Sequence, residues 1–317
     1  MKKTWCGAFF AVMVISLGLA CAHASEEKRS PYRKESMEWK GLTRTYILYL
    51  PVREFEKHPP LVIALHGGGG TAQKMAGFTV KGFQKMADRD EFLLCYPDGV
   101  EGHWNDGRGI SEYRAHKGNI DDVGFLTALI DSLVKNYGVD PARVYVTGAS
   151  NGALMAYRLA CEATGKIAAI APVICPMGEA VYKGPKPAMP ISVMIINGTD
   201  DPLAPYKGGD IHLGKKTLGK AVSTKETVEY FVKLNGCEKA PRTESLPDAD
   251  PGDGCTATVE TYGSGREGTE VILYTIKNGG HTWPGGTQYL PEKVVGKVCR
   301  DFDGASVIWE FFKRHHR

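Results

Sequence analysis

The sequence predicts a three-layer α/β fold, with a mostly parallel central sheet and helices on both of its faces. Short apolar runs recur along the 317 residues, and segments with helical periodicity separate them. Apolar runs without polar alternation suit strands that are buried on both faces, as in a parallel sheet. Alternation of such strands with amphipathic helices is typical of three-layer α/β domains. No Pro/Ser-rich linker, internal repeat or low-complexity tract divides the sequence, so we expect one large domain.

Each expected strand is a continuous apolar run bounded by polar or glycine-rich segments. In chain order these runs are LVIAL (61–65), EFLLCY (91–96), RVYVTG (143–148), AAIAPVI (168–174), ISVMII (191–196) and VILYTI (271–276). They are too short to span a membrane, and short continuous apolar runs suit strands that are buried on both faces.

The clearest expected helix is residues 121–140, between two of these strands. Its apolar residues recur at spacings of three and four, namely Val123, Leu126, Leu129, Ile130, Leu133, Val134 and Tyr137. This pattern gives one apolar face that can lie on the sheet. Asp121 and Asp122 stand at its start, where the helix dipole favours negative charge. Residues 152–163 and 305–315 have the same pattern.

The N-terminus has the three parts of a cleaved secretory signal. Lys2 and Lys3 precede the apolar run AFFAVMVISLGLA (8–20), and AHA (22–24) follows it. We therefore expect a signal peptide over residues 1–24 and a secreted or periplasmic protein. Cys21 suggests lipoprotein anchoring as an alternative, although the preceding GLA fits the lipoprotein pattern poorly. Removal of residues 1–24 would leave 37 basic against 36 acidic side chains, which does not favour a nucleic acid or an anionic membrane as partner.

Ser150 is the candidate nucleophile. It stands in GASNG (148–152), a G-x-S-x-G pattern that a glycine-rich chain can also contain in an ordinary turn. The context favours the catalytic interpretation, because a buried strand precedes the pattern and a helix follows it. A nucleophile elbow requires this strand–turn–helix placement, with small neighbours at the sharp turn.

A serine hydroxyl needs a base, and the base needs an orienting carboxylate. Of the histidines that follow Ser150, His281 is the expected base, because it lies in NGGHTWPGG just after a predicted strand. Asp200 and Asp201 follow another predicted strand, and their spacing alone does not separate them. The acidic stretch 248–253 resembles the start of a calcium loop, but Val259 stands where that loop needs its glutamate, so we expect a solvated acidic loop.

Acyl transfer also needs hydrogen-bond donors for the oxyanion. The backbone N–H of Asn151 is one candidate, because this residue follows the nucleophile. The second donor is expected from HGGGGTA (66–72), in which His66 holds the loop rather than acting as the base. The same loop lacks the Lys-Ser/Thr of a phosphate-binding loop, which disfavours nucleotide binding.

Together these motifs resemble the polyhydroxybutyrate depolymerase-like esterases, which are related to carbohydrate esterase family 1 and its feruloyl and acetylxylan esterases. The resemblance covers about residues 36–315 and rests on LHGGGG, YPDG, WNDGRG, DDVGFLTALIDSL, RVYVTGASNGALMAYRLACE, NGTDDPLAPY, GGHTWPGG and DFDGASVIWEFF. It implies a single α/β-hydrolase domain over residues 25–317. It also implies a secreted serine esterase without metal or cofactor.

The resemblance assigns roles to individual residues. It implies Ser150 as nucleophile, His281 as base, Asp201 rather than Asp200 as the acid, and Gly68 as the oxyanion donor of the loop. The implied substrates are soluble esters: polyhydroxybutyrate oligomers, or feruloyl or acetyl esters. A serine peptidase and a non-catalytic carbohydrate- or polymer-binding protein on the same fold are the alternatives.

Two tryptophans in these motifs are candidate substrate-binding residues. Trp104 and Trp283 lie in loops expected near the active site, where they could stack on an aromatic acyl group or a sugar. The alternative is that they pack the loops.

Six cysteines follow the expected signal peptide, an even number that allows disulfides in an exported protein. Cys237 and Cys255 are separated by only 17 residues rich in Pro, Gly and Asp. Closing a loop of that length would stabilise the fold by about 3 kcal/mol. We therefore expect a Cys237–Cys255 disulfide. Cys95, Cys161 and Cys175 are expected to be buried thiols.

Overall fold

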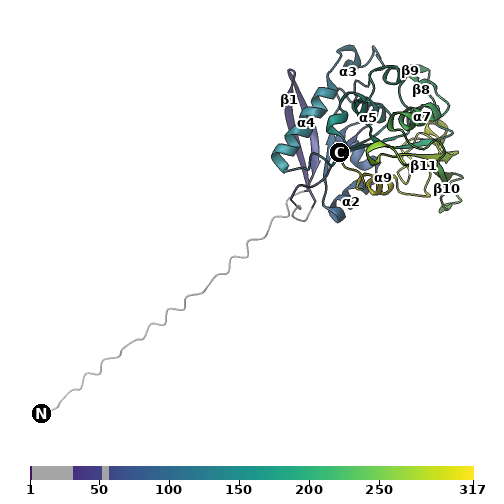
Figure 1. The fold of residues 1–317 in the computed structure, drawn as a ribbon. Coiled ribbons are helices and arrows are strands. Elements are labelled where there is room, and N and C mark those ends of the chain that lie inside the picture. Colours follow the sequence, from purple (N-terminus) through teal and green to yellow (C-terminus); the bar gives the residue numbers. More distant parts are fainter. Residues whose placement is uncertain (2–30, 52–56) are drawn as a thin grey trace. The chain divides into compact units, whose positions relative to one another are not determined.

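The computed structural model describes Met1, residues 31–51 and residues 57–317 (Figure 1). Apart from Met1, the expected signal peptide at residues 1–24 lies outside the described residues. Within them, no helix has both the length and the apolar composition needed to cross a membrane.

The central sheet confirms the expected α/β class. In the described part of the chain, ten strands form one sheet in the order β1-β2-β4-β3-β5-β6-β7-β12-β11-β10. The middle strands, from β4 to β12, pair in parallel. In spatial order they are β4 (Leu93–Pro97), β3 (Leu61–Leu65), β5 (Val144–Ala149), β6 (Ala169–Val173), β7 (Ser192–Gly198) and β12 (Val271–Lys277). These are the six strands that the apolar runs predict.

Antiparallel strands extend the sheet at both edges, and the sequence patterns did not reveal them. One edge holds β1 (Tyr32–Trp39) and β2 (Leu42–Tyr49), and the other holds β11 (Thr256–Tyr262) and β10 (Arg242–Ser245). Most residues of β1, β10 and β11 are exposed or half-buried, so these strands lack the continuous apolar run that marks a central strand. In β2 the buried residues 46–49 follow the polar residues 43–45.

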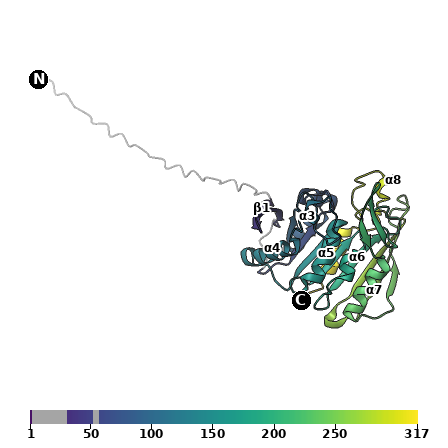
Figure 2. The ribbon, with the colours of Figure 1, turned by 90° about the horizontal axis from the view of Figure 1, so that it is seen from above.

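Helices cover both faces of the sheet, as expected. On one face α4 (Asp122–Tyr137), α5 (Asn151–Glu162) and α7 (Thr224–Asn235) pack against the strands, and Figure 2 shows them in a row. On the other face lie α1 (Ala72–Phe78), α2 (Gly82–Asp90) and α9 (Gly304–Phe312). Short helical turns complete the fold: α3 (Arg114–Lys117), α6 (Glu179–Lys183), α8 (Glu292–Val295), η1 (Thr164–Lys166) and η2 (Arg266–Gly268).

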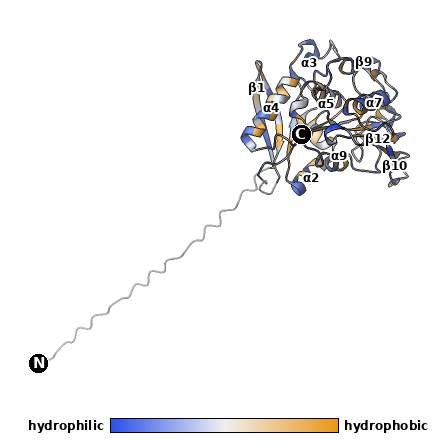
Figure 3. Ribbon diagram, viewed as in Figure 1, coloured by the Kyte–Doolittle hydropathy of each residue, from blue (hydrophilic) through white to orange (hydrophobic). Residues whose placement is uncertain are grey.

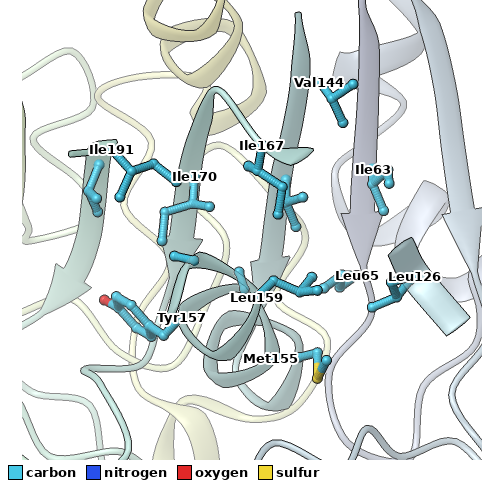
Figure 4. Packing of buried hydrophobic residues seen from close by; sticks show 14 of the residues in the cluster. Ile63, Leu65, Leu126, Val144, Met155, Tyr157, Leu159, Ile167, Ile170 and Ile191 are labelled. Carbon is cyan, nitrogen blue, oxygen red and sulfur yellow. The ribbon is translucent and has the colours of Figure 1, made fainter. Parts of the chain in front are cut away.

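The core is divided in two by the sheet. Because side chains alternate along a strand, Val144 and Val146 of β5 join the cluster beneath α4, α5 and α7, whereas Tyr145 joins the opposite one. Figure 4 shows Leu159 of α5 among strand side chains such as Leu65 and Ile170. Colouring by hydropathy shows both hydrophilic and hydrophobic residues along α4, as expected for a helix with one face on the core (Figure 3).

A separate hairpin stands apart from the sheet. It consists of β8 (Gly209–Leu213) and β9 (Lys216–Ala221), which pair with each other, and Ala221 also forms a single bridge with Gly178. In the chain it follows β7 and Asp201, the expected acid. It therefore forms part of the surroundings of the candidate site.

The expected Cys237–Cys255 disulfide is wrong for this structure. Both cysteines are free, and they pack in core clusters on opposite faces of the sheet. The prediction used only the short sequence separation. It did not include the strand β11, which begins after Cys255 and places this cysteine on the face of the sheet opposite Cys237. Cys95, Cys161 and Cys175 are buried free thiols, as expected.

Candidate active site

Ser150 occupies the sharp turn between β5 and α5. Its backbone has φ 54° and ψ −113°, a conformation that a non-glycine residue rarely adopts. The turn is held because the Ser150 N–H donates to the carbonyl of Val173 on the neighbouring strand, at 3.0 Å. Strain that is fixed in this way by the surrounding structure is typical of functional sites.

The two glycines of the G-x-S-x-G pattern are needed for packing. A Cβ on Gly148 would lie 2.5 Å from the backbone of Gly152, and a Cβ on Gly152 would collide with the carbonyl of Leu65. The strand and the helix therefore approach closely enough to leave Ser150 at the tip of the turn. This geometry is that of the nucleophile elbow expected from the sequence.

His281 and Asp201 come together beyond the carboxyl ends of the neighbouring strands β12 and β7. The Nδ1 atom of His281 lies 2.7 Å from Oδ2 of Asp201, and both side chains are almost fully buried. The other oxygen of Asp201, Oδ1, accepts the backbone N–H groups of Leu203 and Ala204, each at 2.8 Å. The carboxylate is thus fixed on both oxygens and oriented toward the imidazole.

Asp200 points elsewhere. Its Oδ1 accepts a hydrogen bond from the Thr199 hydroxyl at 2.9 Å, and the side chain is exposed. Of the two aspartates that spacing alone left open, Asp201 is the one that contacts His281.

The loop of four glycines lies directly against the serine turn. A Cβ on Gly67 would be 3.6 Å from Cβ of Ser150, and one on Gly68 would be 3.8 Å from Cβ of Asn151. Within the loop, Gly69 donates to the carbonyl of Gly102 and Gly70 to that of Gly67. Among the described residues, no acceptor is found for the N–H of Gly68.

His66 holds this loop and does not face Asp201. Its Nε2 accepts the N–H of Gly99 at 2.9 Å, and its Nδ1 lies 2.8 Å from the carbonyl of Gly67. Burial lowers the pKa of His66. The neutral tautomer with Nδ1–H fits both hydrogen bonds, which agrees with the structural role expected for this residue.

The side chain of Asn151 is held by a buried segment that the sequence analysis did not assign a role. Its Oδ1 accepts the N–H of Trp104 at 2.8 Å, and its Nδ2 donates to Oδ2 of Asp106 at 2.6 Å. Asp106 also forms an ion pair with Arg108, with 2.7 Å between Oδ2 and Nη2. The WNDGRG motif was the available signal, but its contacts with Asn151 could not be inferred without the fold.

The candidate residues surround a cavity of about 750 Å³. Ser150, His281 and the glycine loop line it, together with two apolar groups. One group is Phe78, Tyr289 and Leu290, and the other is Leu203, Ile211, Leu213 and Leu218. A cavity of this size and character suits a small organic ligand.

The assignment of Trp104 and Trp283 as substrate-binding residues is wrong for this structure. Neither lines the cavity, and their exposed fractions are 0% and 1%. The Trp104 indole donates to the carbonyl of His66 at 3.0 Å, and Trp283 packs against Phe78 and Phe83. Both tryptophans support loops, which is the alternative that the sequence left open.

One group of side chains in the described residues has the spacing of a metal site, away from this cavity. Asp253, Cys299 and Asp301 place one ligand atom each within 4.8 Å of the others. The two oxygens of Asp253 already accept the N–H groups of Cys255 and Arg300. Asp253 therefore holds two loop segments together by hydrogen bonds to their backbones.

Comparison with known proteins agrees with this geometry. Residues 44–204 match the family described as Esterase PHB depolymerase. The chain is 34% identical over 279 residues to "Putative esterase NocK" of Nocardia uniformis subsp. tsuyamanensis, a match that covers 86% of this chain and 79% of that protein. It is 29% identical over 235 residues to feruloyl esterase B of Piromyces equi, covering 71% of this chain and 40% of that protein.

A solved structure supports the fold. The acetyl xylan esterase from Aspergillus awamori matches with a TM-score of 0.53 at 16% identity, over 78% of this chain and 93% of that one. The sheet order and the strand–turn–helix at Ser150 thus define a protein with the α/β-hydrolase fold. The chain belongs to the Esterase PHB depolymerase family, and it is a carboxylic ester hydrolase.

Proposed function

We propose that this protein is an exported serine esterase that cleaves carboxylic esters through an acyl-enzyme, with Ser150, His281 and Asp201 as its catalytic residues. The observation that carries the proposal is the 2.7 Å contact between His281 and Asp201 beside the cavity that Ser150 lines. A buried imidazole with its Nδ1–H directed at a carboxylate has Nε2 available as a base.

In the first half of the reaction, Oγ of Ser150 attacks the ester carbonyl carbon while its proton passes to Nε2 of His281. The tetrahedral intermediate collapses, the bond to the alkoxy oxygen breaks, and the alcohol leaves with that proton. Asp201 keeps the imidazole in the required tautomer and stabilises its charged form. Water then attacks the acyl-enzyme in the same way, which releases the carboxylic acid and restores Ser150.

The negative charge of each tetrahedral intermediate needs fixed donors. The N–H groups of Gly68 and Asn151 are proposed for this role, because the glycine loop and the start of α5 meet beside Ser150. The helix dipole of α5, a helix of 12 residues, adds favourable potential at the same point.

The proposed substrates are esters with feruloyl, acetyl or hydroxybutyrate-oligomer acyl groups. The family match and the similarity to feruloyl esterase B support this range, and the cavity has the volume and apolar lining for such groups. Export is proposed from the N-terminal sequence. N-terminal sequencing of protein recovered outside the cytoplasm should begin at or near Ser25, and an intact N-terminus would contradict it.

A substrate panel tests the proposal. It comprises p-nitrophenyl acetate and butyrate, methyl ferulate, acetylated xylan and 3-hydroxybutyrate oligomers, with matched peptide amides alongside. We expect hydrolysis of at least one ester class, loss of that activity in Ser150→Ala, and no hydrolysis of the amides. Ester hydrolysis that persists in Ser150→Ala would refute the catalytic assignment. Comparable cleavage of the amides would indicate a peptidase.

A further inference from the structure

The hairpin β8–β9 forms one side of the cavity without being part of the main sheet. Ile211, His212, Leu213 and Leu218 of this hairpin line the cavity, and Leu213 is strongly exposed. Because the hairpin pairs with no strand of the sheet, other contacts must set its position relative to Ser150.

Arg108 supplies such a contact. Its side chain is 5% exposed, and Nη1 donates to the backbone carbonyl of Leu218 at 2.7 Å. The aliphatic part of Arg108 packs against Gly219, where a Cβ would lie 3.2 Å from Cβ and Cδ of the arginine. Arg108 thus contacts the hairpin backbone by a hydrogen bond and by close packing. Backbone contacts also hold the hairpin, because the N–H of His212 donates to the carbonyl of Leu203 at 2.8 Å and Ala221 forms a bridge with Gly178.

The other side of the guanidinium leads through Asp106 to Asn151, the residue after Ser150. Its Nε lies 3.0 and 2.9 Å from Oδ1 and Oδ2 of Asp106, and its Nη2 lies 2.7 Å from Oδ2. Asp106 is fully buried and accepts the side-chain amide of Asn151 at 2.6 Å. A continuous set of buried polar contacts therefore joins the hairpin, Arg108, Asp106 and the residue after the nucleophile.

We propose that Arg108 is a positioning residue that sets the hairpin wall against the nucleophile and so determines which esters fit. The inference rests on the proposed catalytic role of Ser150. An acetyl ester is short enough to react at Ser150 with little contact to Leu213 or Leu218. An ester with a longer acyl or alkyl chain must extend along the cavity and contact such walls. Displacement of the hairpin should therefore weaken the binding of long esters more than that of short ones.

Two substitutions disturb this contact from opposite sides. Arg108→Lys keeps the positive charge beside Asp106, but an ammonium cannot reproduce the planar fork that reaches both Asp106 and the carbonyl of Leu218. Gly219→Ala, at φ 83°, keeps Arg108 itself and places a methyl group 3.2 Å from the arginine stem, which must shift to make room for it. Gly214→Ala is the matched control, because Gly214 lies in the same hairpin at φ 60° but has no atom within 4 Å of its added Cβ.

The experiment measures kcat and KM for p-nitrophenyl acetate, butyrate and octanoate, and for ethyl, butyl and octyl acetate. Rates are normalised to the active-site concentration from fluorophosphonate titration. We expect Arg108→Lys and Gly219→Ala to lower kcat/KM for the octanoate or octyl ester by roughly tenfold relative to the shortest ester, mainly through KM. Gly214→Ala should leave that ratio as in the wild type.

The outcomes are separable. A purely structural role would lower the number of active sites and reduce all normalised rates equally or not at all, which would overturn the proposal. An unchanged ratio in both series for both variants would also overturn it. If the wild type shows no fluorophosphonate-titratable site, the proposed function fails instead, whatever the hairpin does. If Arg108→Lys does not fold, the comparison of Gly219→Ala with Gly214→Ala still decides the question.

Discussion

Nδ1 of His281 lies 2.7 Å from Oδ2 of Asp201, while the two N–H groups of Leu203 and Ala204 donate to the other carboxylate oxygen. The two oxygens of Asp201 therefore have different partners. Oδ1 binds the backbone of the loop at residues 203–204, and Oδ2 orients the imidazole of His281. A substitution that removes only the negative charge therefore has a predictable geometric effect.

Asp201→Asn should reduce kcat by on the order of 10³–10⁴. The amide oxygen must take the position of Oδ1, because Leu203 and Ala204 donate there, so the amide NH2 faces Nδ1. His281 then carries its proton on Nε2 and cannot accept one from Ser150. Steady-state kinetics on a p-nitrophenyl ester measures the effect.

Asp200→Asn is the control for that variant, because Asp200 is adjacent and exposed. It should reduce activity little, since the Thr199 hydroxyl can also donate to the new amide oxygen. A large loss in Asp200→Asn with near-normal activity in Asp201→Asn would reverse the assignment of the acid.

The central part of the fold could be predicted from sequence because each central strand is buried on both faces. Such strands must be apolar throughout, and the resulting runs are visible without a structure. The edge strands carry no comparable pattern, and neither does the hairpin β8–β9. In β9 exposed lysines and threonine alternate poorly with half-buried residues, so its sequence does not distinguish it from a loop.

The candidate site divides in the same way. Ser150 and His281 follow from local motifs, because the elbow and the histidine loop are both continuous in sequence. The contacts of Asp106, Arg108 and Asn151 join three distant segments, and the burial of Trp104 depends on them. Aromatic residues next to catalytic motifs were interpreted as substrate contacts, whereas the tight loop packing leaves them no exposed surface.

Ser150→Ala and His281→Ala should each lower kcat by several orders of magnitude. The double variant should lose little more than either one, because the nucleophile and the base act in the same step. The measurement is kcat for the two single variants and the double variant on one ester. Losses that multiply in the double variant would show that the two residues act independently.

Trp104→Phe should lower kcat by roughly tenfold and leave KM nearly unchanged. The indole donates to the carbonyl of His66 and so supports the glycine loop that is proposed to supply an oxyanion donor, but it does not line the cavity. Leu290→Ala gives the contrast, because Leu290 lines the cavity and its truncation should mainly raise KM. A raised KM with normal kcat in Trp104→Phe would restore the role of this ring in substrate binding.

The stability of the protein should fall in acid partly because of His66. Burial lowers the pKa of His66 in the folded protein below the value of about 6.5 in the unfolded chain. Below about pH 6.5 the unfolded state therefore binds more protons, and the free energy of unfolding decreases by at most about 1.4 kcal/mol per pH unit for this group.

Denaturant unfolding at about pH 7.5 and about pH 5 measures this contribution through the titration of His66. His66→Gln keeps an acceptor for the N–H of Gly99 but does not titrate, so the acid-induced decrease should be smaller than in the wild type. Part of the decrease should remain, because burial also lowers the pKa of His103 and of His116. An identical decrease in the variant would contradict the role of His66.

The covalent labelling of Ser150 tests the central claim most directly. The protein is treated with a fluorophosphonate and analysed by intact mass spectrometry and peptide mapping, beside Ser150→Ala and His281→Ala. The account predicts one adduct per chain, on the peptide that contains Ser150, none in Ser150→Ala and much slower labelling in His281→Ala. An adduct on another residue, or an unlabelled wild type that still hydrolyses esters, would contradict it.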